Sequence, residues 1–316
     1  MEKLPSLAIV IPCHNESELI RSTWARLKEL AESWEGRIIA GHELVMVNNG
    51  STDDTLEKML EISRQDPHVV IVDLRKNYGY QGSITAGLFT ATKDMIVSVD
   101  ADLQDPPEKI SEMIGKYRDG YEMVLGVRND RKKDFFLKRW AADLYYKLLN
   151  AIGVESVPHH GDFRLLSRAL VEELKKFPER NRYLRGMVLH LESKYAVVIY
   201  ARKERKAGIT KFDIKNLLEF AVDGITSLTN APLRLIVTCG LLIFAISILG
   251  ICYVFYVKFF TERNVPGWAF IALAIMFFGG LQSLFLGILG EYIAKNYLEA
   301  KQRPLFLIRK IYSSSR

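Results

Sequence analysis

Two stretches near the C-terminus, residues 235–257 and 264–290, contain no charged residue. Each is longer than the roughly 20 residues that an α-helix needs to cross a hydrocarbon layer about 30 Å thick. Both lie far from the N-terminus, which has no secretory pattern, so we do not expect a cleavable signal. Two buried helices of a soluble core are the alternative, but charge-free runs of this length are rare outside membranes. The sequence therefore predicts two transmembrane helices, over residues 233–257 and 266–293.

Positively charged residues flank this pair unevenly, and the side richer in Lys and Arg is usually the cytoplasm. The short connecting loop holds only Lys258 and Arg263. The segments outside the pair hold many more, namely Lys203, Arg205, Lys206, Lys211, Lys215 and Arg234 before it and Lys295, Lys301, Arg303, Arg309 and Lys310 after it. We therefore expect a two-span protein of the inner (plasma) membrane, with both termini and the domain before the spans in the cytoplasm.

Small residues form a stripe on the second predicted span. Gly279, Ser283 and Gly287 follow one another at every fourth position. Such a stripe permits close packing against another helix, either the first span or another subunit. A homo-oligomer is therefore expected, with its order left open.

The region before the spans alternates between short apolar runs and helix-like segments. Strands that are apolar throughout and separated by helices are typical of a parallel sheet covered on both faces. In such a sheet the loops after the strands meet at one edge, where ligands bind. The expected strands are Leu7–Ile11, Leu44–Val47, Val69–Val72, Met95–Val99 and Met123–Leu125, and the loops after the first four read "IPCHNESE", "NNGSTDDT", "RKNYGYQGS" and "DADLQDPPE".

Residues 211–232 carry apolar side chains at helical spacing, with Lys, Asp and Glu on the other face. The pattern fits an amphipathic helix at the bilayer surface and a core helix of the soluble domain about equally well. Its position directly before a span favours the bilayer surface. The expected organisation is a cytoplasmic α/β domain over 1–205, an amphipathic juxtamembrane segment over 206–232, the two spans, and a basic cytoplasmic tail over 294–316.

The segment "DADLQDPPE" gathers four carboxylates, although the chain has a net charge of +6. Asp105 directly precedes two prolines and Glu108, an order that predicts an N-cap and a capping-box acid at the start of a helix. Asp100 and Asp102 have no such explanation. Two carboxylates at a strand end repel unless a cation lies between them, and Gln104 could add an amide oxygen. The sequence therefore indicates a divalent metal at this strand end.

Six motifs together resemble one enzyme family. "IPCHNE", "VNNGSTDD", "NYGYQGSITAGL", "DADLQDPPE", "GDFRLLSR" and "RKAGITKF" occur in the order and at about the spacing found in GT-A-type inverting glycosyltransferases. More specifically, the chain resembles the polyprenyl-phosphate glycosyltransferases, the group that contains bactoprenol glucosyltransferases and dolichol-phosphate mannose synthases. The resemblance covers nearly the whole chain, because two C-terminal spans are typical of the bactoprenol branch. It implies a GT-A fold, which is Rossmann-like with a mostly parallel sheet and helices on both faces.

The resemblance also implies a donor site across the ends of the first four strands. Asp102 and Gln104 would hold Mg²⁺ or Mn²⁺, which offsets the charge on the leaving diphosphate. Arg205 and Lys211 fit a phosphate-binding R-x-x-G-x-[ST]-K pattern, although charge at a membrane surface is the alternative. The residues expected to bind the nucleotide-sugar are Pro12, His14, Asn15, Glu16, Asn48, Asn49, Asn77, Gln81, Asp100, Ala101, Arg205 and Lys211. The family usually has one or two acids where this chain has Asn48 and Asn49, which weakens any inference about the base.

Three further residues are implied on the acceptor side. Arg128 and Arg131 match the family's phosphate-binding arginines, in a basic segment that could otherwise be a solvated helix face. Asp162 matches an acid that serves as general base in enzymes that glycosylate hydroxyls. A phosphate acceptor is already anionic at neutral pH. We therefore expect Asp162 to orient the acceptor or to sense its charge, with any role as a base secondary.

The implied activity is inverting transfer of a hexose from a nucleotide-sugar to undecaprenyl or another polyprenyl phosphate. UDP-glucose is the leading donor, with GDP-mannose, a UDP-amino-arabinose derivative and UDP-N-acetylglucosamine as alternatives, and no nucleic acid partner is expected. A processive polysaccharide synthase is disfavoured because "LKRW" at Leu137–Trp140 lacks the glutamine of the Q-x-x-R-W motif. A catalytically inactive membrane scaffold is the alternative from another class.

Overall fold

The computed structural model describes residues 4–129, 157, 160–180, 182–191, 194–201, 231–260 and 267–313. The chain divides into two compact units. The first comprises Met1–Ile214 together with Arg303–Arg316, and the second comprises Lys215–Gln302.

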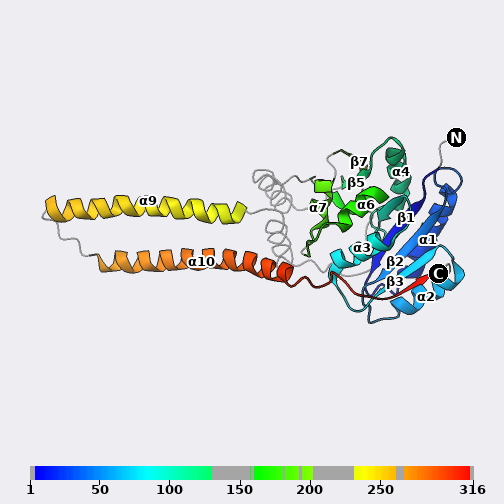
Figure 1. The fold of residues 1–316 in the computed structure, drawn as a ribbon, viewed down its shortest axis with the longest axis horizontal. Helices are drawn as coiled ribbons and strands as arrows, with labels where there is room; N and C mark the ends of the chain where they lie inside the picture. The colour runs from blue at the N-terminus through cyan, green and yellow to red at the C-terminus, as the bar shows by residue number, and fades with distance from the viewer. Residues whose placement is uncertain are drawn as a thin grey trace. The chain divides into compact units, whose positions relative to one another are not determined.

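The first unit is built on one eight-stranded sheet (Figure 1) with the order β7-β5-β6-β4-β1-β2-β3-β8. The strands are β1 (Leu7–Cys13), β2 (His42–Asn48), β3 (Val69–Leu74), β4 (Met95–Ser98), β5 (Met123–Arg128), β6 (His160–Ser167), β7 (Tyr195–Tyr200) and β8 (Ile308–Ser313). Strands β4, β1, β2 and β3 are parallel to their neighbours in this order, and β5 is parallel to β7. Strand β6 pairs antiparallel with both β4 and β5, and β8 pairs antiparallel with β3. The five strands expected from the sequence are confirmed.

Helices cover both faces of this sheet, because successive strand residues point to opposite sides. In β1, Leu7, Ile9 and Ile11 join one buried cluster while Ala8 and Val10 join the other. The first cluster takes side chains from α1 (Ile20–Trp34), α2 (Thr55–Gln65) and α4 (Ile110–Arg118), and the second from α3 (Gly79–Thr90), α6 (Arg168–Lys175) and α7 (Leu184–Leu191). The expected α/β fold with a mostly parallel sheet covered on both faces is therefore confirmed.

The C-terminal segment supplies an edge strand that the sequence did not predict. Val70, Ile71 and Val72 of β3 pair with Ser313, Tyr312 and Ile311 of β8. Arg309 of β8 places its Nη1 3.5 Å from Oδ2 of Asp73, which is buried at the end of β3. Part of the segment that the sequence suggested to be a basic tail is thus built into the sheet.

Removing residues 307–316 is expected to lower the melting temperature of the purified chain by more than about 5 °C. The deletion removes the β8 ladder and leaves the apolar edge of β3 open to aggregation. Thermal unfolding in detergent measures the effect, and deletion of residues 314–316 alone, which follow the strand in sequence, is the matched control. Equal melting temperatures for the two deletions would contradict a stabilising role for β8.

The second unit contains two long helices, α9 (Ala231–Phe260) and α10 (Trp268–Ala300). The windows Pro232–Gly250 and Phe277–Ala300 have mean hydropathies of 2.3 and 1.3, and none of the side chains described in these windows is buried. Leu241 and Ile275, for example, are 65% and 68% exposed. Two helices long and apolar enough to cross a membrane are therefore present, and the alternative of two buried core helices is wrong. The amphipathic pattern over residues 211–230 lies outside the described residues.

Candidate active site

The loops after four strands meet at one edge of the sheet, as the sequence predicted. Cys13 at the end of β1 pairs with Asn48 of β2, and Asn48 pairs with Asp73 of β3. On the other side of β1, Val10 pairs with Ser98, the last residue of β4. Parallel pairing in this register brings the carboxyl ends of β4, β1, β2 and β3 together.

Hydrogen bonds tie the loops after β1, β2 and β3 to one another. His14 donates from Nδ1 to the carbonyl of Asn49 at 3.0 Å, and its Nε2 accepts from the side-chain amide of Asn77 at 3.1 Å. Asn15 has a positive φ of 55° and accepts from the backbone amide of Thr52 at 2.8 Å. These three loops therefore form one connected wall.

Asn48 and Asn49 are buried within this wall, and their amide groups bond to protein partners. Asn48 donates to Oδ1 of Asp73 at 2.7 Å. Asn49 donates to Oδ1 of Asn77 at 3.0 Å and accepts from the backbone amide of Tyr78 at 2.9 Å. Both asparagines thus fix the shape of the loops, and Asp73 supplies a buried carboxylate one strand further along the sheet.

Close backbone packing in the same wall depends on Gly50. Its φ is +61°, and a Cβ at this position would lie 2.4 Å from the carbonyl carbon of Lys76 and 2.5 Å from the amide nitrogen of Asn77.

Three other residues expected at the donor site lie nearby in the fold. Pro12 lies within β1, the backbone amide of Glu16 donates to Thr55 at 2.9 Å, and the side chain of Gln81 accepts from the backbone amide of Leu184 at 3.3 Å.

The acids after β4 lie beside this wall. Burial raises the pKa of Asp100 to about 6, and the charges of Asp105, Asp162 and Asp102 act in the same direction. The hydroxyl of Tyr80 donates to Asp100 at 2.5 Å. Ala101 is buried, and its carbonyl accepts from Thr23 at 2.6 Å. Crowded carboxylates around an Asp100 whose pKa is raised are the environment that a divalent cation would relieve.

Asp102 and Gln104 are positioned on one tight turn. The backbone amide of Gln104 donates to Oδ1 of Asp102 at 3.2 Å, and Leu103 between them has a positive φ of 48°. Within the described residues, no group of three His, Cys, Asp or Glu side chains could hold a metal ion. Mg²⁺ commonly takes one or two carboxylates, with substrate phosphates completing its coordination. The oxygen ligands that this turn offers fit that mode of binding.

Asp105 does not cap a helix, and that prediction is wrong. The short 3₁₀ turn Pro107–Lys109 has Pro106 at its N-cap and no side-chain cap bond. Asp105 is buried instead, with Oδ2 3.3 Å from Nη2 of Arg128 on β5. Glu108 pairs with Arg26 of α1 at 2.8 Å. Both acids therefore join distant elements, and Asp105 requires its charged partner because its carboxylate is buried.

Asp162 lies on β6, and both of its carboxylate oxygens contact arginines. Nη2 of Arg164 pairs with Oδ1, while Nε and Nη2 of Arg185 donate to Oδ2 at 3.2 and 2.8 Å. Burial opposes ionisation of Asp162, but the charges of Arg164 and Arg185 outweigh it and lower the pKa of the carboxyl. A carboxylate held in this way is a poor proton acceptor.

The sequence reasoning did not identify Arg164, Arg185 or Tyr80. One signal was present, because residues two apart in a strand share a face and "DFR" therefore places Arg164 beside Asp162. Arg128, which the resemblance implies, lies on β5, and its Nε donates to the hydroxyl of Tyr200 at 3.2 Å. Arg131, Arg205 and Lys211 lie outside the described residues.

Comparison with known proteins agrees with this arrangement. The model of glycosyl transferase family 2 matches residues 8–175, which is more than half of the chain. The chain belongs to glycosyltransferase family 2.

Relatives of this family 2 glycosyltransferase match over nearly its full length. The uncharacterized glycosyltransferase YkcC of Bacillus subtilis is 41% identical, covering 96% of this chain and 94% of the relative. The bactoprenol glucosyl transferase of Shigella phage SfII is 37% identical, covering 96% and 97%. A solved structure of glucosyl-3-phosphoglycerate synthase from Mycobacterium tuberculosis, in complex with Mn²⁺, UDP and glucosyl-3-phosphoglycerate, covers 69% of this chain and 76% of its own, with 18% identity and a TM-score of 0.46.

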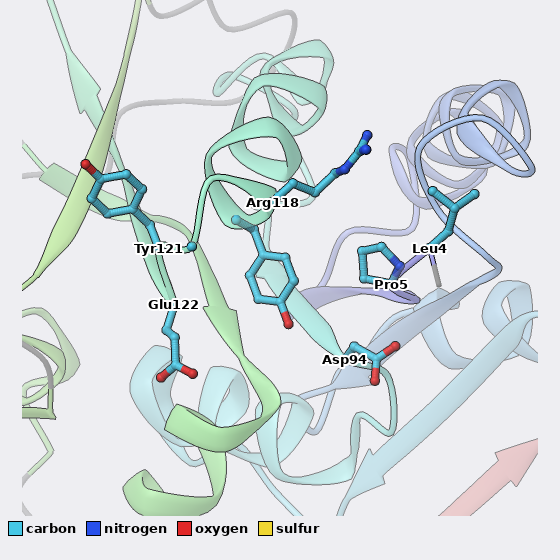
Figure 2. Close-up of a pocket in the computed structure, with 8 residues that line it drawn as sticks. Leu4, Pro5, Asp94, Arg118, Tyr121 and Glu122 are labelled. Carbon is cyan, nitrogen blue, oxygen red and sulfur yellow. The ribbon is translucent and has the colours of Figure 1, made fainter. Parts of the chain in front are cut away.

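A separate hollow of about 520 Å³ lies at the opposite edge of the transferase's sheet (Figure 2). Its lining includes Pro5, Asp94 and Glu122, which directly precede β1, β4 and β5 or lie one residue further back, together with Tyr117 and Tyr121. The amide and hydroxyl of Ser6 bond to Asp94 at 2.8 and 2.7 Å. Because it lies at the amino ends of the strands, this hollow is not part of the candidate active site.

Proposed function

We propose that this family 2 transferase moves a hexose from a nucleotide-sugar, with UDP-glucose as the leading donor, to undecaprenyl or another polyprenyl phosphate. The observation that carries the proposal is the Asp162 carboxylate held between two arginines. An acceptor hydroxyl requires a base, whereas an acceptor phosphate near neutral pH is already anionic and requires cations. The relatives named bactoprenol glucosyl transferases and the two apolar helices support a lipid acceptor.

In the proposed reaction, an oxygen of the acceptor phosphate forms a bond to the anomeric carbon as the bond from that carbon to the diphosphate breaks. In-line displacement converts an α-linked donor into a β-linked lipid monophosphosugar and releases the nucleoside diphosphate. The connected loops after β1, β2 and β3 bind the nucleotide. Asp102 and Gln104 would hold Mg²⁺ or Mn²⁺, which when bound offsets charge on the leaving diphosphate. Asp100 and Tyr80 orient the donor between that turn and Asp162.

We further propose that the hairpin of the two apolar helices, α9 and α10, anchors the protein in the inner membrane with the catalytic sheet and both termini in the cytoplasm. The excess of Lys and Arg outside the hairpin supports this orientation. The Gly279–Gly287 stripe on α10 stays a predicted packing surface for a homo-oligomer. A Cβ added at Gly279 or Gly287 would meet nothing within 4 Å.

The deciding experiment supplies the purified full-length chain with undecaprenyl phosphate and a panel of labelled nucleotide-sugars. UDP-glucose is expected to give a chloroform-soluble monophosphosugar, and the panel includes GDP-mannose, a UDP-amino-arabinose derivative and UDP-N-acetylglucosamine. A chelator is expected to abolish turnover, and added Mn²⁺ or Mg²⁺ to restore it. No transfer from any donor, together with no metal-dependent binding of nucleotide, would favour the inactive scaffold.

A further inference from the structure

The C-terminal strand β8 contains a β-bulge where it passes the end of β3. Asp73 of β3 lies opposite Lys310, and the next residue, Leu74, lies opposite Ile308. Arg309 is therefore the extra residue of the bulge. A bulge takes one residue out of the regular alternation of a strand and gives its side chain a new direction, and bulges are frequent next to active sites. This bulge lies at the carboxyl end of β3, which is the edge of the sheet that carries the candidate active site.

The guanidinium of Arg309 spans the point at which β3 ends and its loop begins. Its Nη1 lies 3.5 Å from Oδ2 of Asp73, and its Nη2 donates to the carbonyl of Arg75 at 3.1 Å. The backbone amide of Arg75 donates to the carbonyl of Leu307 at 2.9 Å. The C-terminal segment therefore holds both backbone groups of the first residue of the loop, and so sets the direction in which the chain leaves β3.

Asp73 depends on this contact. It is 1% exposed, and its Oδ1 accepts from the side-chain amide of Asn48 at 2.7 Å. Within the part of the chain that the structure describes, its Oδ2 accepts no hydrogen bond, so the guanidinium of Arg309 supplies the positive charge beside it. A buried carboxylate is costly without such a charge. The position of the Asp73 carboxylate is therefore tied to Arg309.

Asp73 and Arg75 lead into two of the loops that line the nucleotide side of the site. Asn48, which donates to Asp73, also accepts from the backbone amide of Ser51 at 3.2 Å, so it fixes the loop after β2. The loop that begins at Arg75 contains Asn77, whose side chain bonds to the loops after β1 and β2. One guanidinium thus holds the starting points of both routes into the connected wall.

We propose that Arg309 is a positioning residue of the nucleotide subsite, and that it acts through Asp73 and the start of the loop after β3. The inference rests on the proposed function and assigns what completes the donor half of that site. A guanidinium holds two acceptors in fixed directions at once, which a lysine ammonium does less well. A part of the chain that follows the two apolar helices in sequence therefore contributes to nucleotide binding without contacting the nucleotide.

The test measures binding of UDP and of GDP, in the presence of Mn²⁺, to the full-length chain in detergent by titration calorimetry. Arg309→Gln is expected to weaken binding of the preferred nucleotide by about 5- to 10-fold, a modest loss because the side chain is 56% exposed. Arg309→Lys is expected to recover part of this affinity, because lysine keeps the charge. In transfer kinetics, Arg309→Gln should raise the KM for the nucleotide-sugar and leave kcat and the KM for lipid phosphate unchanged.

Lys310→Gln is the matched control, because it removes the same charge from the next position of the same strand. The Nζ of Lys310 lies 4.8 Å from the centre of the Tyr312 ring. This variant is expected to bind the nucleotide as the unsubstituted chain does. Equal nucleotide affinities in Arg309→Gln and Lys310→Gln would overturn the inference.

A double-mutant cycle with Asp73→Asn tests the route. The loss of affinity in the double variant is expected to be smaller than the product of the two single losses, because both substitutions break the same contact. Single losses that multiply would overturn the inference. Nucleotide binding that depends on Arg309 in a chain that transfers no sugar to lipid phosphate would leave the inference standing and overturn the proposed function instead. A chain that binds neither UDP nor GDP would overturn both.

Discussion

Replacing Asp162 by Asn is expected to lower the rate of sugar transfer by about 100-fold or more. It is also expected to lower the free energy of unfolding by about 3–5 kcal/mol, because removing one partner of a buried ion pair leaves the other uncompensated. Arg164 and Arg185 both contact the carboxylate that the substitution neutralises. Steady-state kinetics with lipid phosphate and denaturant unfolding measure the two effects.

The pH dependence of this variant separates positioning from proton transfer. Because the pKa of Asp162 is lowered, its contribution to stability is present above the unfolded value near 3.9 and is lost only as pH falls through the lower folded value. Asp162 therefore stays ionised between about pH 6 and pH 9, and the loss of transfer rate in Asp162→Asn should be constant over that range. Recovery of the rate at higher pH would contradict this and favour a base.

A buried aspartate outside the site provides the control. Asp66 is 1% exposed, accepts from Nε1 of Trp24 at 2.8 Å and precedes β3, at the opposite edge of the sheet from the candidate active site. Asp66→Asn is expected to lower stability and to leave the KM for lipid phosphate unchanged. Equal changes of KM in both variants would mean that the Asp162 effect is only structural.

Replacing Gly50 by Ala is expected to raise the KM for the nucleotide-sugar by about 10- to 100-fold, because small displacements of binding groups are costly. The new Cβ would lie within 2.5 Å of the backbone of Lys76 and Asn77. That backbone must move, and Asn77 carries the hydrogen bonds that join His14 to Asn49. Nucleotide-sugar kinetics and UDP affinity measure the result.

Gly36→Ala separates this steric effect from backbone strain. Gly36 has a similar positive φ of +71°, but a Cβ there would meet nothing within 4 Å. The control should cost about 1 kcal/mol of stability and leave the KM unchanged. A Gly50→Ala variant that behaved like Gly36→Ala would mean that the loop wall tolerates the shift.

The parts of the fold that follow from local pattern were predictable. Strands β1 to β5 each contain an apolar run, and the alternation of these runs with helices indicated both a parallel sheet and loops meeting at one edge. The antiparallel strands were not predictable in the same way. Strand β6 contains Asp162 and the buried Arg164, so it does not read as an apolar run, and β8 follows a membrane-length helix.

The candidate site shows the same division. Resemblance identified Asp162 and Arg128 one by one, but their partners depend on contacts between distant segments. Arg185 reaches Asp162 from α7, and Asp105 reaches Arg128 across the sheet. Asp105 was assigned to a helix start because a proline follows it. Its ion pair with a distant residue could not be predicted, because such a pair leaves no pattern in the adjacent residues.

The pairing of β8 with β3 restricts how many times this chain can cross a bilayer. The polypeptide leaves the sheet after β7, runs through α9 and α10, and then returns to the same sheet as β8. A strand ladder cannot form through a membrane, so the number of crossings between residues 201 and 308 must be even. One extra span inserted there, or one removed, would place β8 on the other side of the membrane from β3 and leave the edge of β3 unpaired. A reporter fused after residue 316 would therefore report the location of the catalytic sheet itself.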